Sequence, residues 1–153
     1  MNTNSRQAGE ELEEICSVRV GDGLYGLPIA HIIEILGGMR PKPVPLAPSF
    51  VGGLVHYRGD VLTSVSLREL LGLGPREETQ ALLVVEGSGG PFGLLVDTVG
   101  NIVRVSASDY EANPRIVQEN RRVLFAGAYK LQQSLLIMLD PAQLEPARLA
   151  LVD

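Results

Sequence analysis

Hydrophobic and polar residues alternate along much of the chain with a period of two, which is typical of half-buried β-strands. In residues 14–20, for example, Cys16, Val18 and Val20 share one face of such a strand. Cys16 is therefore expected to be a small core residue rather than a nucleophile. Alternation also predicts a strand over residues 61–66, and runs rich in apolar residues predict strands over 80–87, 91–97, 99–105, 122–131 and 134–140.

Turn-forming residues separate these strands and pair them into hairpins. Asp22-Gly23 predicts a turn because glycine accepts a positive φ, and residues 24–29 form the return strand. Pro28 cannot donate a ladder hydrogen bond, so it should lie at a strand end or edge. Gly87 to Gly90 predicts a second hairpin, and Gln132-Gln133 predicts a third. The sequence therefore predicts a mainly β protein.

Other stretches predict short helices or irregular chain. Residues 29–36 carry isoleucine and leucine at spacings of three and four, which fits either a turn or two of helix or a bent strand ending at Gly37-Gly38. Prolines force residues 41–48 to run extended over the surface. A short helix is expected over residues 67–74, and another after Asp140-Pro141.

The tripeptide Arg58-Gly59-Asp60 matches the adhesion motif of extracellular proteins. Here it lies between two apolar runs, where the chain must reverse, so turn chemistry predicts a bend between strands. An adhesion protein would need a signal peptide and usually disulfides. The polar N-terminal region has no apolar signal core and the chain has one cysteine, so a cytoplasmic location is expected.

Two segments of the chain resemble each other at a constant offset. Residues 25–29 read Tyr-Gly-Leu-Pro-Ile and residues 92–96 read Phe-Gly-Leu-Leu-Val, and both follow a glycine-rich turn. The similarity continues from Ile32 and Ile35 to Val99 and Ile102. Such an echo predicts two related subdomains, although the match is short enough for chance to remain the alternative.

Composition and charge narrow the class of protein. The 153 residues are enough for one domain, with 17 glycines, 10 prolines and no tryptophan, which favours short strands and turns. Residues 1–13 show no apolar period and are expected to be a flexible tail, leaving a domain over 14–153. The net charge of −5, with scattered basic residues, argues against nucleic acid and anionic membranes as partners. No apolar run is long enough for membrane insertion.

The sequence contains no recognisable motif for catalysis or for binding a cofactor. The two histidines and one cysteine lack metal-ligand spacing. Gly21 to Gly26 formally matches a dinucleotide pattern, but a strand containing Pro28 follows where a helix would have to begin. The sequence therefore predicts a non-enzymatic protein without a cofactor, whose turns and strand edges serve as docking surface.

Four segments, in order along the chain, resemble a known family. They are residues 18–35, 48–68, 92–103 and 124–144. Together they are similar to CheW, the coupling protein of bacterial chemosensory arrays, over roughly residues 14–153. The resemblance implies two packed SH3-like, five-stranded β-barrel subdomains with short helices.

The resemblance also implies an adaptor role. Proteins of this family couple the cytoplasmic tip of chemoreceptors, the methyl-accepting chemotaxis proteins, to the regulatory domain of a CheA-type histidine kinase, and are recruited to receptor clusters. Arg58 matches the arginine of the family's Asn-Leu-Arg-Gly turn, where it would either contact a partner carboxylate or be an ordinary solvated arginine. Partner contacts are implied at Ile32, Glu34, Ile35, Gly53, Arg58, Gly59, Val99 and Ile102.

The chain departs from the family pattern near this turn. His56-Tyr57 stands where the family has Asn-Leu, Thr63 where it has proline, and Ser66 where it has aspartate. Loss of a carboxylate at Ser66 would remove a contact that could orient Arg58 or Arg68. The alternative function is therefore a diverged accessory adaptor that has lost receptor or kinase binding and links the pathway to another partner.

Overall fold

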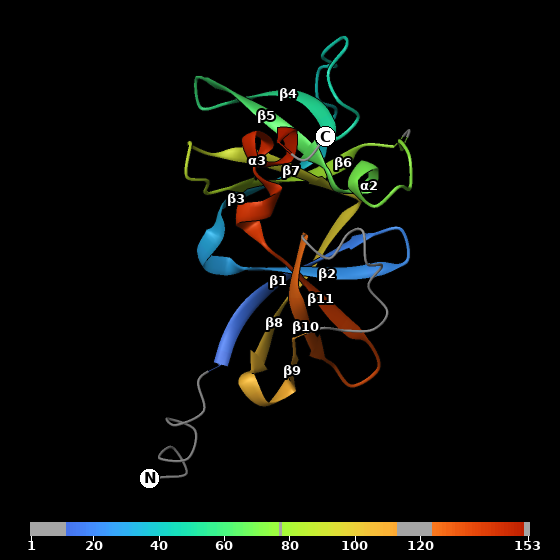
Figure 1. Ribbon diagram of the computed structural model, residues 1–153, viewed down its shortest axis with the longest axis vertical. Helices are drawn as coiled ribbons and strands as arrows, with labels where there is room; N and C mark the ends of the chain where they lie inside the picture. The colour runs from blue at the N-terminus through green and yellow to red at the C-terminus, as the bar shows by residue number, and fades with distance from the viewer. Residues whose placement is uncertain (1–11, 77, 113–123, 152–153) are drawn as a thin grey trace.

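The computed structural model describes residues 12–76, 78–112 and 124–151, and consists mainly of β-strands (Figure 1). The strands are β1 (Leu12–Val20), β2 (Gly23–Pro28), β3 (Ile32–Met39), β4 (Val51–Tyr57), β5 (Asp60–Ser66), β6 (Gln80–Val85), β7 (Phe92–Val96), β8 (Thr98–Ser106), β9 (Tyr110–Glu111), β10 (Phe125–Lys130) and β11 (Leu135–Leu139). The helices are all short: α2 (Leu67–Leu70), α3 (Pro146–Ala150), and the 3-10 turns η1 (Ile29–His31), η2 (Ala107–Asp109) and η4 (Pro141–Leu144).

The strands form two sheets that follow one another along the long axis of the molecule (Figure 1). We call them sheet A, with the order β8-β1-β2-β11-β10-β9, and sheet B, with the order β3-β6-β7-β5-β4. Neighbouring strands are antiparallel except at two places: β2 beside β11 in sheet A and β5 beside β7 in sheet B. The predicted all-β class with two β subdomains and short helices is thus confirmed, and sheet A gains a sixth, two-residue strand.

The two sheets repeat the same arrangement of strands. The order β8-β1-β2-β11-β10 corresponds to β3-β6-β7-β5-β4, including the direction of each pair. Gly26 on β2 lies opposite Met138, and Gly93 on β7 lies opposite Ser64, at equivalent points of the two parallel pairs. The echo in the sequence therefore reflects equivalent positions in related subdomains rather than chance.

The chain crosses between the two sheets twice. β2 belongs to sheet A, and after η1 the chain continues as β3 in sheet B. β7 belongs to sheet B, and after the single residue Asp97 it continues as β8 in sheet A. Consequently each sheet contains strands from both halves of the chain.

The hydrophobic core is divided into a shared part and two separate parts. The largest cluster draws residues from both sheets, among them Val18 and Leu27 from sheet A and Leu83 and Leu94 from sheet B. A smaller cluster lies within each sheet: Ile15, Val105, Tyr129, Leu136 and Met138 in sheet A, and Val55, Leu62, Leu82, Val84 and Leu95 in sheet B. Both faces of the central strands are buried, as expected for sheets that curl around their own core and also pack on each other.

Several local predictions are confirmed. Cys16 is buried in the shared cluster, and burial raises the pKa of its thiol, so it behaves as a small apolar residue. Pro28 is the last residue of β2, where a missing N–H does not interrupt a ladder. Asp140 accepts a hydrogen bond from Ala142 N at the start of η4, as predicted for a helix cap.

The boundaries of other elements differ from the predictions. Residues 29–36 contain both alternatives in succession, since η1 makes one 3-10 turn and β3 then runs extended. Gly37-Gly38 does not end β3, because Gly38 takes a φ of 64° within a bulge and the strand continues to Met39. β1 begins at Leu12, and the expected tail otherwise falls outside the described residues.

Candidate functional site

The turn that carries Arg58 is a two-residue β-hairpin between β4 and β5. Tyr57 and Asp60 form the last strand pair, so Arg58 and Gly59 alone make the turn. Their φ values are 49° and 84°, and positive φ at both central residues characterises the tight turns that match the twist of a hairpin. The predicted bend at Arg58-Gly59-Asp60 is therefore confirmed. The left-handed backbone conformation of Arg58 costs about 1 kcal/mol, and residues held in such conformations are often functional.

Arg58 contacts Glu34, another of the residues expected to bind partners. Arg58 Nη2 donates a hydrogen bond of 2.9 Å to Glu34 Oε1, and the two side chains form an ion pair. Tyr57 supports the pair: its hydroxyl donates to the same oxygen at 2.7 Å, and the Arg58 guanidinium lies 5.3 Å from the centre of its ring. We call Glu34, Tyr57 and Arg58 the seam cluster.

The seam cluster joins the two edges of sheet B. Glu34 lies on β3 and Tyr57 on β4, and these strands are the opposite edges of the sheet. Leu36 and Met39 from β3 and Tyr57 from β4 pack on the same internal cluster of sheet B. The seam cluster therefore lies where the curled sheet closes on itself.

Hydrogen bonding fixes the ionisation of the seam cluster. The hydrogen bond from Tyr57, and next that from Arg58, lower the pKa of Glu34 below its ordinary value of 4.5, so the carboxylate is charged at neutral pH. The same contacts with Glu34 raise the pKa of Tyr57 and of Arg58. The Arg58 side chain is 73% exposed and that of Glu34 is 35% exposed, so both charges are accessible.

The predicted apolar contact residues lie on two edge strands. Ile35 on β3 is 44% exposed, and Ile102 on β8 is 58% exposed. Ile32 and Val99 are partly buried against the shared cluster and support these edges. Since β3 and β8 hold equivalent edge positions in sheets B and A, the structure places the predicted isoleucines at matching points of the two subdomains.

Gly53 differs from the other predicted residues because it is buried. Its φ is 132°, and an added Cβ would lie 2.6 Å from the carbonyl oxygen of Lys42. The register of β4 shifts between Val51 and Gly53, and Ser64 Oγ donates a 2.8 Å hydrogen bond to the Gly53 carbonyl. Gly53 therefore shapes the hairpin that presents Arg58.

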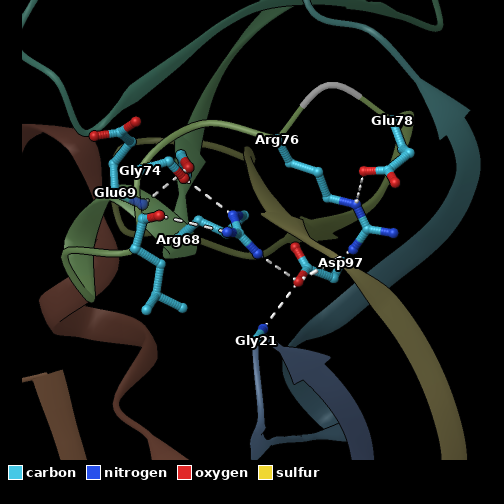
Figure 2. A network of polar contacts seen from close by, with 9 residues as sticks. Gly21, Arg68, Glu69, Gly74, Arg76, Glu78 and Asp97 are labelled. Carbon is cyan, nitrogen blue, oxygen red and sulfur yellow. Dashed lines mark hydrogen bonds and ion pairs between the residues drawn. The ribbon is translucent and has the colours of Figure 1, made fainter.

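A second polar cluster, which the sequence did not predict, is centred on Asp97 (Figure 2). Asp97 Oδ2 accepts hydrogen bonds from Gly21 N at 2.9 Å and Arg68 Nη1 at 2.8 Å, and Arg76 Nη1 lies 3.1 Å from it. Asp97 is the crossover residue between β7 and β8, Gly21 belongs to the β1–β2 turn, and Arg68 lies on α2. The cluster thus ties segments next to both sheets together.

This cluster corrects the expectation about Ser66. Arg68 is oriented by Asp97 and by a 3.0 Å hydrogen bond to the Gly74 carbonyl, so it does not need a carboxylate at position 66. Ser66 instead caps α2, accepting a 3.2 Å hydrogen bond from Glu69 N. Arg58 is oriented by Glu34. The departure at Ser66 is therefore accommodated locally.

Neither a metal-binding cluster nor a membrane-spanning helix is found among the described residues. Within this part of the chain, no group of three or more histidine, cysteine, aspartate or glutamate side chains could hold a metal ion. The helices described there are also too short and too polar to cross a membrane.

Comparison with known proteins places this geometry in a family. The protein-family model described as "CheW-like domain" matches residues 14–147 of this chain. "Chemotaxis protein CheW" of Rhizobium meliloti (strain 1021) is 30% identical over 129 residues, which are 83% of each chain. "Protein FrzA" of Myxococcus xanthus is 35% identical over 108 residues, which are 67% of this chain and 65% of the relative.

A solved structure shows the same fold. The crystal structure of scaffolding protein TtCheW from Thermoanaerobacter tengcongensis matches with a TM-score of 0.79 at 24% identity, over 88% of this chain and 92% of that chain. The family model spans most of the chain, and the relative from Rhizobium meliloti aligns over most of both sequences. This protein therefore belongs to the CheW-like family.

Proposed function

We propose that this chemotaxis adaptor couples the cytoplasmic tip of chemoreceptors to the regulatory domain of a CheA-type histidine kinase, without catalysing a reaction itself. Its family supplies scaffolds of the chemotaxis pathway, and relatives over most of its length carry the name chemotaxis protein. The observation that carries the proposal is the seam cluster, an accessible ion pair presented by a strained turn at the edge of sheet B.

The proposed contact surface has a charged and an apolar part. Glu34 and Arg58 supply the charges, with Gly59 allowing the tight turn that projects them. Exposed Ile35 and Ile102 supply apolar contacts on edge strands. Ile32 and Val99 anchor these strands by packing on the core cluster that the two sheets share, and Gly53 shapes the β4–β5 hairpin.

An accessory adaptor that has lost one partner is less favoured. The family model matches residues 14–147, and the departure at Ser66 is accommodated by its capping role. His56 and Thr63 are partly or fully exposed on the β4–β5 hairpin, so they alter the surface beside Arg58 without disturbing the fold. They are the positions at which partner preference would differ.

Titration calorimetry with two purified partners tests the proposal: the kinase regulatory domain and a receptor tip fragment from the same organism. We expect wild-type protein to bind both, and Arg58→Ala to weaken binding to at least one by about tenfold, as for loss of a charge-assisted contact. Lys130→Ala is the matched control, because Lys130 is an exposed cation at the end of β10 in sheet A.

The outcomes separate the candidate functions. Binding to both partners that depends on Arg58 supports the proposal. Binding to the receptor fragment alone would favour the accessory adaptor. Binding to neither partner would overturn both.

A further inference from the structure

We propose that Tyr57 is a positioning residue that lets Arg58 change partners: its hydroxyl keeps Glu34 at the seam of sheet B when Arg58 leaves Glu34 for a carboxylate of a binding partner. This inference rests on the proposed function, because it requires a partner that takes up Arg58. It goes beyond that function by assigning the closure of sheet B and the contact with the partner to different side chains.

The hydrogen bonds of the seam cluster make such an exchange possible. Tyr57 Oη and Arg58 Nη2 both donate to Glu34 Oε1, at 2.7 Å and 2.9 Å. Because one carboxylate oxygen serves both donors, losing Arg58 leaves that oxygen bonded to Tyr57. Closure of the sheet edge therefore does not depend on Arg58 remaining in place.

The two donors differ in how firmly they are held. Tyr57 is only partly exposed, and its ring packs on the internal cluster of sheet B. Arg58 is 73% exposed at the tip of the hairpin. An ion pair with such an exposed arginine adds little stability, and its long side chain changes rotamer easily. Tyr57 is therefore the fixed donor and Arg58 the one that can be released.

The electrostatics of Glu34 agree with this division. The largest cause of its lowered pKa is the hydrogen bond from Tyr57, with that from Arg58 second. The contact that lowers the pKa of Glu34 most is therefore the one that remains when Arg58 turns away.

The ring of Tyr57 has a second role in guiding the arginine. The Arg58 guanidinium lies 5.3 Å from the ring centroid, which is within the range of a cation–π contact. This contact requires the ring and not the hydroxyl. Removing the hydroxyl alone and removing the whole ring should therefore have different effects.

The experiment compares Tyr57→Phe, Tyr57→Leu and Arg58→Ala with wild-type protein. Tyr129→Phe is a matched control, because the Tyr129 hydroxyl also donates to a glutamate, Glu13, at 3.1 Å, but in sheet A. Amide hydrogen exchange over β3 reports on the seam without any partner. Calorimetry with the kinase regulatory domain reports on binding, and thermal melting verifies that each variant is folded.

We expect Tyr57→Phe to accelerate exchange over β3 several-fold and to weaken binding about fivefold. Arg58→Ala should weaken binding more strongly but leave β3 exchange at the wild-type rate. Tyr57→Leu should match Tyr57→Phe in exchange and lose further affinity, because it also removes the ring. Tyr129→Phe should leave both β3 exchange and binding unchanged.

Two results would overturn the inference: unchanged β3 exchange in Tyr57→Phe, or faster exchange in Arg58→Ala than in Tyr57→Phe. In the second case Arg58 would be the residue that closes the seam. If wild-type protein bound no partner, the proposed function would fail, and so would the proposal that Arg58 moves from Glu34 to a partner. The rates of amide hydrogen exchange over β3 would still show which residue holds Glu34.

Discussion

Gly53 shows how a single backbone position controls the hairpin that presents the candidate site. Its φ of 132° lies where side chains are rarely tolerated, and a Cβ would meet the Lys42 carbonyl oxygen at 2.6 Å and Pro41 at 2.9 Å. Neither contact can be relieved by rotating a flexible side chain, because one atom is backbone and the other belongs to a proline ring. The glycine is therefore required by the conformation and the space at this bulge.

We predict that Gly53→Ala lowers the free energy of unfolding by about 3 kcal/mol, from backbone strain and overpacking together. Gly59→Ala is the comparison, since Gly59 also has a positive φ, 84°, but nothing lies within 4 Å of its added Cβ. That variant should lose about 1 kcal/mol. Urea denaturation measures both, and equal losses would show that space at Gly53 is irrelevant.

The sequence predicts Arg58 and Glu34 as site residues through their place in family-like segments, but not their contact. Glu34 lies on the edge strand β3 and Arg58 in the turn that follows the opposite edge strand β4, and these edges meet only when the whole sheet has curled. The role of Tyr57 is hidden for the same reason: its hydroxyl finds Glu34 only across that closure. Alternation along a strand indicates which face a residue occupies, but it does not show that the two edges meet, where the only backbone pairing among the described residues is the single bridge between Lys42 and Leu54.

Among the elements, the crossover between β7 and β8 is held by a single residue, Asp97. Its side chain is 7% exposed, and Arg68 and Arg76 share its Oδ2 while Gly21 N donates to the same atom. Removing the carboxylate would leave Arg68, itself 19% exposed, without its charged partner.

We therefore expect Asp97→Ala to lower the free energy of unfolding by about 3 kcal/mol, the range found when one member of a buried ion pair is removed. Glu14→Ala provides the contrast, because the Glu14–Arg104 pair is 50% and 69% exposed and should contribute less than about 0.5 kcal/mol. Thermal or urea unfolding would compare them. Similar losses for both variants would contradict a stabilising role for the crossover cluster.

Most strands are predictable from alternation and most hairpins from glycine, but two features of the elements are not. β9 has only two residues, too few to show a period. The hairpin β10–β11 corresponds to β4–β5. The feature that the two hairpins share is a backbone bulge, which does not show in the alternation of apolar and polar residues. The register shifts at Val51/Gly53 in one hairpin and at Phe125/Gly127 in the other, and both glycines have positive φ.

At the scale of the molecule, the dominant property is that each sheet is assembled from both halves of the chain. Sheet A takes β1 and β2 from the first half, and sheet B takes β6 and β7 from the second. The echo at a constant offset predicts two related subdomains. It does not show which strands share a sheet, because β3 follows β2 along the chain but lies in sheet B, and β8 follows β7 but lies in sheet A.

This arrangement predicts that neither half folds alone. A fragment of residues 1–76 would contain β1 to β5. It would lack β11, which pairs with β2, and β6, which pairs with β3. We expect each of the fragments 1–76 and 77–153 to be unfolded by circular dichroism and to regain β structure on mixing. A cooperative thermal transition in either isolated fragment would show that the subdomains are independent.

The pairing of β2 with β11 also has a consequence for biosynthesis. Tyr25 lies opposite Ile137, so the β1–β2 hairpin acquires this second neighbour only after β11 has been synthesised, which follows every strand of sheet B. Until then the edge of β2 stays without its β11 partner, and an unpaired strand edge favours aggregation. The strands of sheet B all lie within residues 32–96, so this sheet can form before β11 is available, whereas sheet A is completed only afterwards although it contains β1 and β2.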